Sequence, residues 1–137
     1  WLDRVEDPWL WGLFRHQVAG AWVKPMGQGG VAILGDAAHP TLPFLAQGAS
    51  MGLEDAWVLA HSLASHDSPA AALAAYQSLR KPRATRIVAA ANANARAYHL
   101  SGLPRMIGHT GLRLLGRLSP GTMLSRFDWL YDHDVTL

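Results

Sequence analysis

The residues from Gly35 to Ala56, GDAAHPTLPFLAQGASMGLEDA, hold the side chains best suited to binding chemistry in this chain. Asp36 directly follows a short apolar run, and an ionised carboxylate only accepts hydrogen bonds, so it suits the hydroxyl groups of a polyol. Gly48 lets a ligand approach the backbone closely where a helical segment begins. The free N–H groups of that helix start favour a flat heterocycle that develops negative charge. We expect a binding site here and assign no catalytic residue.

A strand and a helix must position these residues. Val31–Leu34 is a continuous apolar run behind the glycine-rich turn 27–30, which predicts a buried strand that pairs with Trp22-Val23 as a hairpin. The segment 47–65 has helical character, and its apolar residues recur at three- and four-residue spacings that predict one core-facing side. These residues, with Met51, are Leu53, Ala56, Trp57, Ala60, Leu63 and Ala64.

Three further elements follow. Ser68-Pro69 predicts a helix start, with Ser68 as N-cap, and the helix should run to about Leu100 with a kink that Pro82 causes near Leu79. A third helix is predicted over 104–118, and the apolar tail 127–131 should dock on another element. We divide the chain at residue 65, into 1–65 with the glycine-aspartate motif and a helical segment 66–137.

The motif resembles the second flavin motif of the class A flavoprotein monooxygenases, the group that includes para-hydroxybenzoate hydroxylase and salicylate hydroxylase. The matching residues are Gly35 to His39, Pro40, Pro43, Gln47-Gly48 and Glu54-Asp55-Ala56, with Tyr76, Arg80, Pro82, Arg83 and the tail 128–131 downstream. The resemblance covers most of the chain, and the length of the match makes the motif specific.

The resemblance implies the fold and the site residues. The fold class would be α/β, a fragment of an FAD/NAD(P)-binding Rossmann-like flavoprotein, here a short β-hairpin followed mainly by α-helices. Asp36 would bond a ribityl hydroxyl of FAD, Pro43 would line the pocket beside the flavin, and the helix start would face the flavin N1–C2=O edge. The implied cofactor-binding residues are Gly35, Asp36, Ala37, Pro43, Gly48, Ala49, Ser50 and Met51.

The same resemblance implies an FAD-dependent monooxygenase that uses NADH or NADPH to hydroxylate a small aromatic substrate. Its cofactor carries the chemistry, while the protein supplies position and electrostatics. The N-terminal part of the same polypeptide would be a further partner, because no G-x-G-x-x-G phosphate loop occurs in the 137 residues. We expect a cytoplasmic protein, since the chain has no cysteine, no signal peptide and no apolar run long enough for a membrane span. A net charge of +2 gives no indication of nucleic-acid binding.

Several alternatives stay open. The chain could be a helical interaction module whose partner surface is the apolar face around Trp1, Trp9, Trp11 and Trp22, or part of a related flavin dehydrogenase or halogenase. Asp36 could cap a turn instead of binding a ligand.

Two basic features also have competing interpretations. We expect His39 to be a packed residue bonded to nearby backbone, and no pair of histidines has convincing metal-ligand spacing. Arg80, Arg83 and Arg86 form a basic stripe, which could contact FAD phosphates or a nicotinamide dinucleotide. We favour a solvated face, or ion pairs with carboxylates outside this chain.

The lack of a phosphate loop gives a first prediction. This chain, purified alone and dialysed against FAD, should keep no flavin absorbance, because the pyrophosphate has no site to occupy. Stoichiometric and tight FAD binding by the isolated chain would contradict this prediction.

Overall fold

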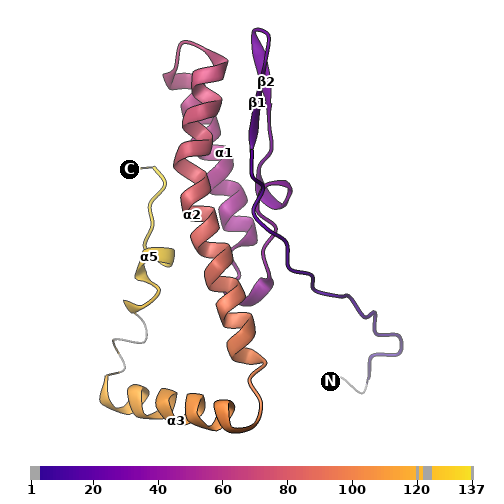
Figure 1. Ribbon diagram of the computed structural model, residues 1–137, viewed down its shortest axis with the longest axis vertical. Helices are drawn as coiled ribbons and strands as arrows, with labels where there is room; N and C mark the ends of the chain where they lie inside the picture. The colour runs from indigo at the N-terminus through magenta and orange to yellow at the C-terminus, as the bar shows by residue number, and fades with distance from the viewer. Residues whose placement is uncertain (1–3, 120, 122–124, 137) are drawn as a thin grey trace.

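A computed structural model describes residues 4–119, 121 and 125–136. The elements in chain order are β1 (Val23–Met26), β2 (Gly29–Ala32), the 3₁₀ turns η2 (Gly35–Ala37) and η3 (Pro43–Leu45), and the helices α1 (Gly48–Ser65), α2 (Pro69–Tyr98), α3 (Gly102–Leu118) and α5 (Asp128–Tyr131). Figure 1 shows the hairpin lying along the paired helices α1 and α2, while α3 crosses beyond the end of α2. A β-hairpin followed by helices agrees with the predicted α/β fragment.

The two strands form the predicted hairpin, but not with the predicted limits. They pair antiparallel from Val23 opposite Ala32 to Met26 opposite Gly29, so only residues 27 and 28 form the loop. Gly27 has φ of +56°, which a glycine adopts without strain. The prediction of a buried strand over 31–34 is wrong, since Val31 is 55% and Leu34 39% exposed. A two-stranded hairpin that rests one face on a helix leaves the other face open.

Gly30 lets the hairpin lie close to α2. A Cβ atom at this position would stand 2.5 Å from Cδ1 of Leu73 and 3.0 Å from the carbonyl oxygen of Lys24. The neighbouring Gly29 has far more room, since its nearest atom would be the Met26 carbonyl oxygen at 4.0 Å. The glycines around this turn therefore serve two purposes. Gly27 adopts a positive φ in the loop, and Gly30 allows close packing.

Helix α1 turns the opposite side to the core from the one that its apolar residues predict. Its buried residues are Met51, Asp55, Val58 and Ser62. Leu53 is 73% and Trp57 51% exposed. Of the side chains assigned to the core, Met51 is buried and the prediction for Leu53 and Trp57 is wrong. The side that carries Asp55 faces inward because Asp55 has a charged partner on α2, as described below.

Helix α2 supplies most of the core. Ser68 caps it through a hydrogen bond from Ala71 N at 3.2 Å, and Pro82 lies inside one continuous helix instead of ending it. The Tyr76 hydroxyl donates to the Ile33 carbonyl at 3.0 Å, and the Gln77 side chain accepts from Trp22 N at 2.6 Å. These two bonds tie the hairpin to α2.

The tryptophans near the N-terminus differ in their surroundings. Trp9 is 85% and Trp11 80% exposed, as expected for an uncovered apolar surface, whereas Trp22 is only 1% exposed and belongs to the core. Trp1 lies outside the described residues. The interpretation of all four as one outward surface is therefore wrong for Trp22, which packs against the rings of His39 and Tyr76 at centroid distances of 5.2 and 6.0 Å.

Helix α3 and the C-terminal tail differ in burial. Helix α3 begins two residues before the predicted start and buries none of its side chains. The tail docks as predicted, with Leu130 only 2% exposed. Within the described part of the chain, no helix combines the length and the apolar character that crossing a membrane requires.

The contrast between Gly29 and Gly30 gives a prediction. Gly30→Ala should lower the free energy of unfolding by roughly 1–3 kcal/mol, because the backbone oxygen of Lys24 cannot move away as a side chain can. Gly29→Ala, the control in the same strand, should cost much less. Urea unfolding of the two variants measures the difference, and equal losses would contradict the close packing at Gly30.

Candidate functional site

The loop Gly35–His39 forms one tight turn at the end of the hairpin. The Gly35 carbonyl accepts hydrogen bonds from Ala38 N and His39 N, both at 2.9 Å. Gly35 has φ of +57°, a left-handed conformation that a residue with a Cβ atom adopts only at a cost. The turn buries Ala38 and His39 and leaves Asp36 and Ala37 exposed. The conformation of this loop therefore presents the acid to the surface.

Asp36 does not cap the turn that contains it. The 3₁₀ turn η2 has no side-chain cap, and the Asp36 carboxylate makes no hydrogen bond within the described ranges of the chain. The alternative in which this residue serves only as a turn cap is thus contradicted. An exposed carboxylate with free lone pairs can accept hydrogen bonds from a ligand.

The start of α1 offers hydrogen-bond donors. Gln47 precedes the helix without a side-chain cap bond, and the first helical residues, Gly48, Ala49 and Ser50, have no partner one turn earlier for their N–H groups. Ala49 and Ser50 are exposed, and Gly48 is half-buried. Such a helix start carries a partial positive charge that favours an electron-rich group.

Met51 differs from the three residues before it. Its N–H group already donates to the Gln47 carbonyl at 2.9 Å, and its side chain is 0% exposed within the core. Met51 therefore has neither an amide nor a side chain free for a ligand, and the expectation that it contacts a cofactor does not fit the structure.

The backbone just before α1 is strained. Ala46 has φ of +52°, and it is the one non-glycine residue with positive φ in the described ranges. An alanine in this region costs energy that the surrounding structure must offset, and such residues gather at functional sites. Pro43, at the start of η3 three residues earlier, is exposed. The segment 43–48 thus connects two exposed elements through a strained turn.

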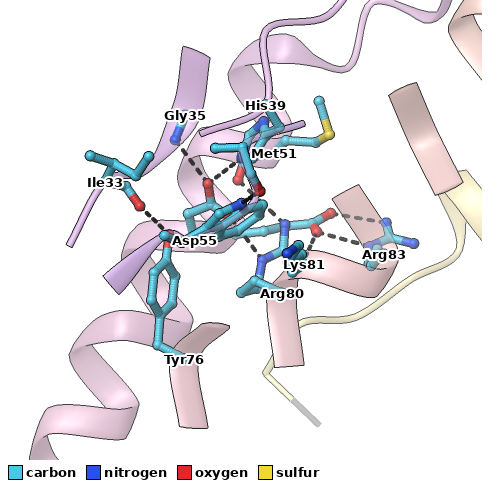
Figure 2. Close-up of polar contacts among 12 residues, drawn as sticks. Ile33, Gly35, His39, Met51, Asp55, Tyr76, Arg80, Lys81 and Arg83 are labelled. Carbon is cyan, nitrogen blue, oxygen red and sulfur yellow. Dashed lines mark hydrogen bonds and ion pairs between the residues drawn. The ribbon is translucent and has the colours of Figure 1, made fainter. Parts of the chain in front are cut away.

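Asp55 joins the loop to both helices (Figure 2). Its Oδ2 atom accepts from Gly35 N at 2.9 Å and from His39 Nε2 at 2.5 Å. Its Oδ1 atom accepts from Arg80 Nε at 2.9 Å. Asp55 and His39 are both 0% exposed and Arg80 is 2% exposed, so these bonds lie in the interior.

The arginines of α2 complete this cluster. Arg80 Nη1 lies 2.6 Å from Glu54 Oε2, and Arg83 holds both oxygens of Glu54 at 2.9 Å. Arg83 also donates to the Trp129 and Leu130 carbonyls at 3.0 and 3.1 Å, which secures the C-terminal tail.

The interpretation of the basic stripe is therefore wrong for Arg80 and Arg83, while Arg86 is exposed as expected. Arg80 and Arg83 are neither solvated nor paired with carboxylates outside the chain, because Glu54 and Asp55 of α1 neutralise them. The same pairing leaves no reason to assign them to FAD phosphates. The guanidinium of Arg86 stacks 3.8 Å from the centre of the Trp129 ring. The stripe holds the tail and α1 against α2.

His39 is packed, as expected, but its partner is a carboxylate and not the backbone. Its other ring nitrogen, Nδ1, is buried without a partner in the described part of the chain. Among the described residues, no group of three or more His, Cys, Asp or Glu side chains could hold a metal ion. Among the described residues, the His39 side chain thus has one hydrogen bond, the one to Asp55.

The sequence interpretation recognised Glu54-Asp55 as part of a motif but missed the role of Asp55. One signal was available, because two adjacent acids on α1 and two arginines three positions apart on α2 offer matching charges. Burial of the acids could not be deduced, since the opposite side of α1 is more apolar.

The two acids carry opposing influences on their pKa values. Burial raises the pKa of Asp55, but the hydrogen bonds from His39, Gly35 and Arg80 outweigh burial and hold it below the ordinary value of 3.8. Burial likewise raises the pKa of Glu54, while the hydrogen bonds and charges of Arg83 and Arg80 bring it below 4.5. Both carboxylates are thus ionised in the folded chain near neutral pH.

Most of the predicted site residues are exposed. The η2 turn contacts α1, where a Cβ atom on Gly52 would lie 3.9 Å from Cα of Gly35. Two hollows lie elsewhere. One of about 370 Å³ follows the α2 residues 77–85, and one of about 460 Å³ lies between α1, α2 and the tail. Neither is lined by the eight predicted cofactor-binding residues. Acceptor and donors on an open surface fit one side of a large ligand such as a flavin nucleotide.

Comparisons with known proteins agree with this chemistry. The sequence profile of a family described as "FAD binding domain" matches residues 12–91, more than half of the chain. The chain is 37% identical to a 3-amino-4-hydroxybenzoate 2-monooxygenase of Streptomyces platensis over 98% of its length and 32% of the relative. It is 36% identical to a salicylate hydroxylase of Pseudomonas putida, over 98% of the chain and 29% of the relative. A 3-hydroxybenzoate 6-hydroxylase of Klebsiella oxytoca is 40% identical over 80% of the chain and 27% of that protein. The chain thus spans about a third of the length of these relatives.

The ion-pair cluster predicts a large difference between two arginines. Arg80→Ala should lower the free energy of unfolding by about 3–5 kcal/mol, because it leaves Asp55 buried with its charge uncompensated. Arg86→Ala, the control two turns along α2, removes an exposed contact with Trp129 and should cost about 1 kcal/mol or less. Denaturant unfolding measures both, and similar losses would contradict a buried charge cluster.

The depressed pKa values predict how stability depends on pH. A carboxylate whose pKa is lower in the folded than in the unfolded state stabilises the fold above its unfolded value, and that contribution is lost as pH falls through the folded value. The chain should therefore lose stability as pH falls below about 4.5, as Glu54 and Asp55 take up protons. Asp55→Asn should reduce the slope of unfolding free energy against pH at the acid end. An unchanged slope would contradict the depressed pKa of Asp55.

Proposed function

This chain belongs to the FAD binding domain family, and we propose that it forms the side of an FAD site that faces the ribityl chain and the flavin ring in an aromatic monooxygenase. The observation that carries the proposal is the Asp36 carboxylate, which is exposed and makes no hydrogen bond within the described residues, on a loop that contacts α1, the helix whose first turn has no side-chain cap. An acceptor and a set of N–H donors on one surface match a polyol chain attached to an electron-rich ring.

Each exposed residue has a distinct role in this proposal. Asp36 accepts a hydrogen bond from a ribityl hydroxyl, and its neighbours Gly35 and Ala37 bring the backbone near the same chain. The N–H groups of Gly48, Ala49 and Ser50 face the pyrimidine edge of the flavin, where they stabilise negative charge in the reduced form. Pro43 borders the space beside the ring. Met51 supports the helix start from within the core.

The activity follows from the relatives together with the site. The names of the three relatives describe monooxygenation or hydroxylation of small aromatic acids. We infer an enzyme that hydroxylates a small aromatic substrate with NADH or NADPH as reductant. Bound FAD supplies the electron transfer and oxygen activation, and the residues of this chain hold it in place and exclude water on one side. The larger fold would be Rossmann-like, and the boundary at residue 65 stays a prediction.

A substitution at Asp36 tests the cofactor site. In the full-length protein, Asp36→Ala should weaken FAD binding by roughly ten- to a hundredfold, because a charge-assisted hydrogen bond contributes roughly 1.5–3 kcal/mol. Asp36→Asn should weaken it less, since the amide oxygen still accepts. Recovery of flavin fluorescence on dissociation measures the affinity.

Asp67→Ala is the matched control. Asp67 is also an exposed aspartate, but it follows the other end of the 18-residue helix α1, roughly 27 Å from Gly48 at 1.5 Å per residue. This variant should bind FAD like the parent. Equal affinity of Asp36→Ala and the parent would overturn the ribityl contact.

A further inference from the structure

We propose that Asp55 is a positioning residue for the FAD site, which it serves without contacting the cofactor by fixing both ends of the loop that carries Asp36. This inference rests on the proposed function, because it concerns how the same site is held in shape. The sequence motif and the comparisons assign no such role to Asp55.

The geometry of the loop carries the proposal. Gly35 and His39 are its first and last residues, and one oxygen atom, Oδ2 of Asp55, accepts hydrogen bonds from both, at 2.9 and 2.5 Å. Figure 2 shows Gly35 and His39 on the same carboxylate of Asp55. Asp36 lies between the two anchored residues and points to the surface. The carboxylate of Asp55 therefore sets the span of the turn from which Asp36 projects.

The other restraints on the loop come from the segment before the hairpin, where Ala19 N donates to the Ala38 carbonyl at 2.8 Å and the Trp22 ring packs on His39. His39 has one side-chain hydrogen bond, the one to Asp55, because its Nδ1 atom has no partner among the described residues. Within the turn, the bonds from residues 38 and 39 to the Gly35 carbonyl shape the backbone but do not attach it to α1. Gly35 also lies against α1 near Gly52, where a Cβ atom would stand 3.9 Å from the Gly35 Cα atom, an ordinary packing distance. Loss of the Asp55 carboxylate would free the loop from α1 at both ends.

Asp55 is itself fixed. Its Oδ1 atom accepts from Arg80 Nε at 2.9 Å, and the same arginine contacts Glu54 and the Met51 carbonyl, at 2.6 and 3.5 Å. Three acceptors on α1 hold the guanidinium, so it keeps the Asp55 carboxylate in one orientation. Arg80 of α2 thus fixes Asp55, and Asp55 fixes the loop. The position of the exposed Asp36 therefore depends on the buried Asp55.

The adjacent acids of α1 provide a matched experiment in the full-length protein. Asp55→Asn and Glu54→Gln each remove one negative charge from the same cluster, but only Asp55 contacts the loop. Both variants should lose stability. Asp55→Asn alone should accelerate amide hydrogen exchange in the Gly35–His39 loop, weaken FAD binding by roughly tenfold and shift the visible absorbance of the bound flavin. Glu54→Gln should keep loop exchange, FAD affinity and flavin spectrum like those of the parent.

A second pair acts from the other side of the same bond. His39→Gln keeps an N–H donor near the position of Nε2, whereas His39→Leu has a similar size and no donor. His39→Leu should show the loop exchange and flavin shift of Asp55→Asn, and His39→Gln should restore much of the parent behaviour. This pair also decides the question if Asp55→Asn does not fold.

The two proposals fail in different ways. Unchanged FAD affinity in Asp36→Ala would overturn the FAD contact itself. Weakened affinity in Asp36→Ala, combined with parent-like loop exchange and flavin spectrum in Asp55→Asn or in His39→Leu, would overturn the positioning role and leave the FAD contact standing. Equal effects of Glu54→Gln and Asp55→Asn on the loop would also overturn it, because they would reflect a general loss of charge in the cluster.

Discussion

A carboxylate that is fully withdrawn from water needs a charged partner and several donors, and Asp55 imposes this requirement on the whole chain. Its donors come from the end of the hairpin and from α2, so these elements must meet at one turn of α1. The requirement explains why α1 turns the side that carries Asp55 inward while Leu53 and Trp57 remain exposed. Arg83 extends the cluster to the C-terminal tail, which is bound through backbone carbonyls.

The same cluster distinguishes side chains that are paired within the chain from those that are free to bind a ligand. Asp55, Glu54, Arg80 and Arg83 neutralise one another, which leaves them unsuited to bind a phosphate or a substrate. Asp36 follows Gly35, whose N–H group donates to Asp55, but Asp36 itself stays out of the cluster. A ligand site needs groups whose hydrogen-bonding capacity is unspent and whose position is fixed by others. The Gly35–His39 loop satisfies both conditions, since its ends are anchored and its centre is free.

Much of this site could be predicted from the sequence because the relevant constraints are local. A glycine before an acid, two prolines and a second glycine at a helix start fix the backbone within a few residues, and the motif is long enough to identify a flavin family. The hairpin and the N-cap at Ser68 are local in the same sense. What failed depends on distant partners. Periodicity assigned Leu53 and Trp57 to the core because an apolar side usually packs inward. Periodicity does not indicate that Asp55 and Arg80, which are 25 positions apart, form a hydrogen bond. The buried position of Trp22 likewise depends on Gln77 and Tyr76 of α2.

The central claim is that FAD lies against the Asp36 loop and the start of α1. Hydrogen–deuterium exchange of the full-length protein, measured with and without FAD, tests it most directly. Bound FAD should protect the amides of Gly48, Ala49 and Ser50 and those of Asp36 and Ala37, for which no hydrogen-bond partner is seen among the described residues. The loop between α1 and α2 around Asp67 should exchange equally in both states. Protection confined to other parts of the protein, with no change at residues 35–37 and 48–50, would contradict the account.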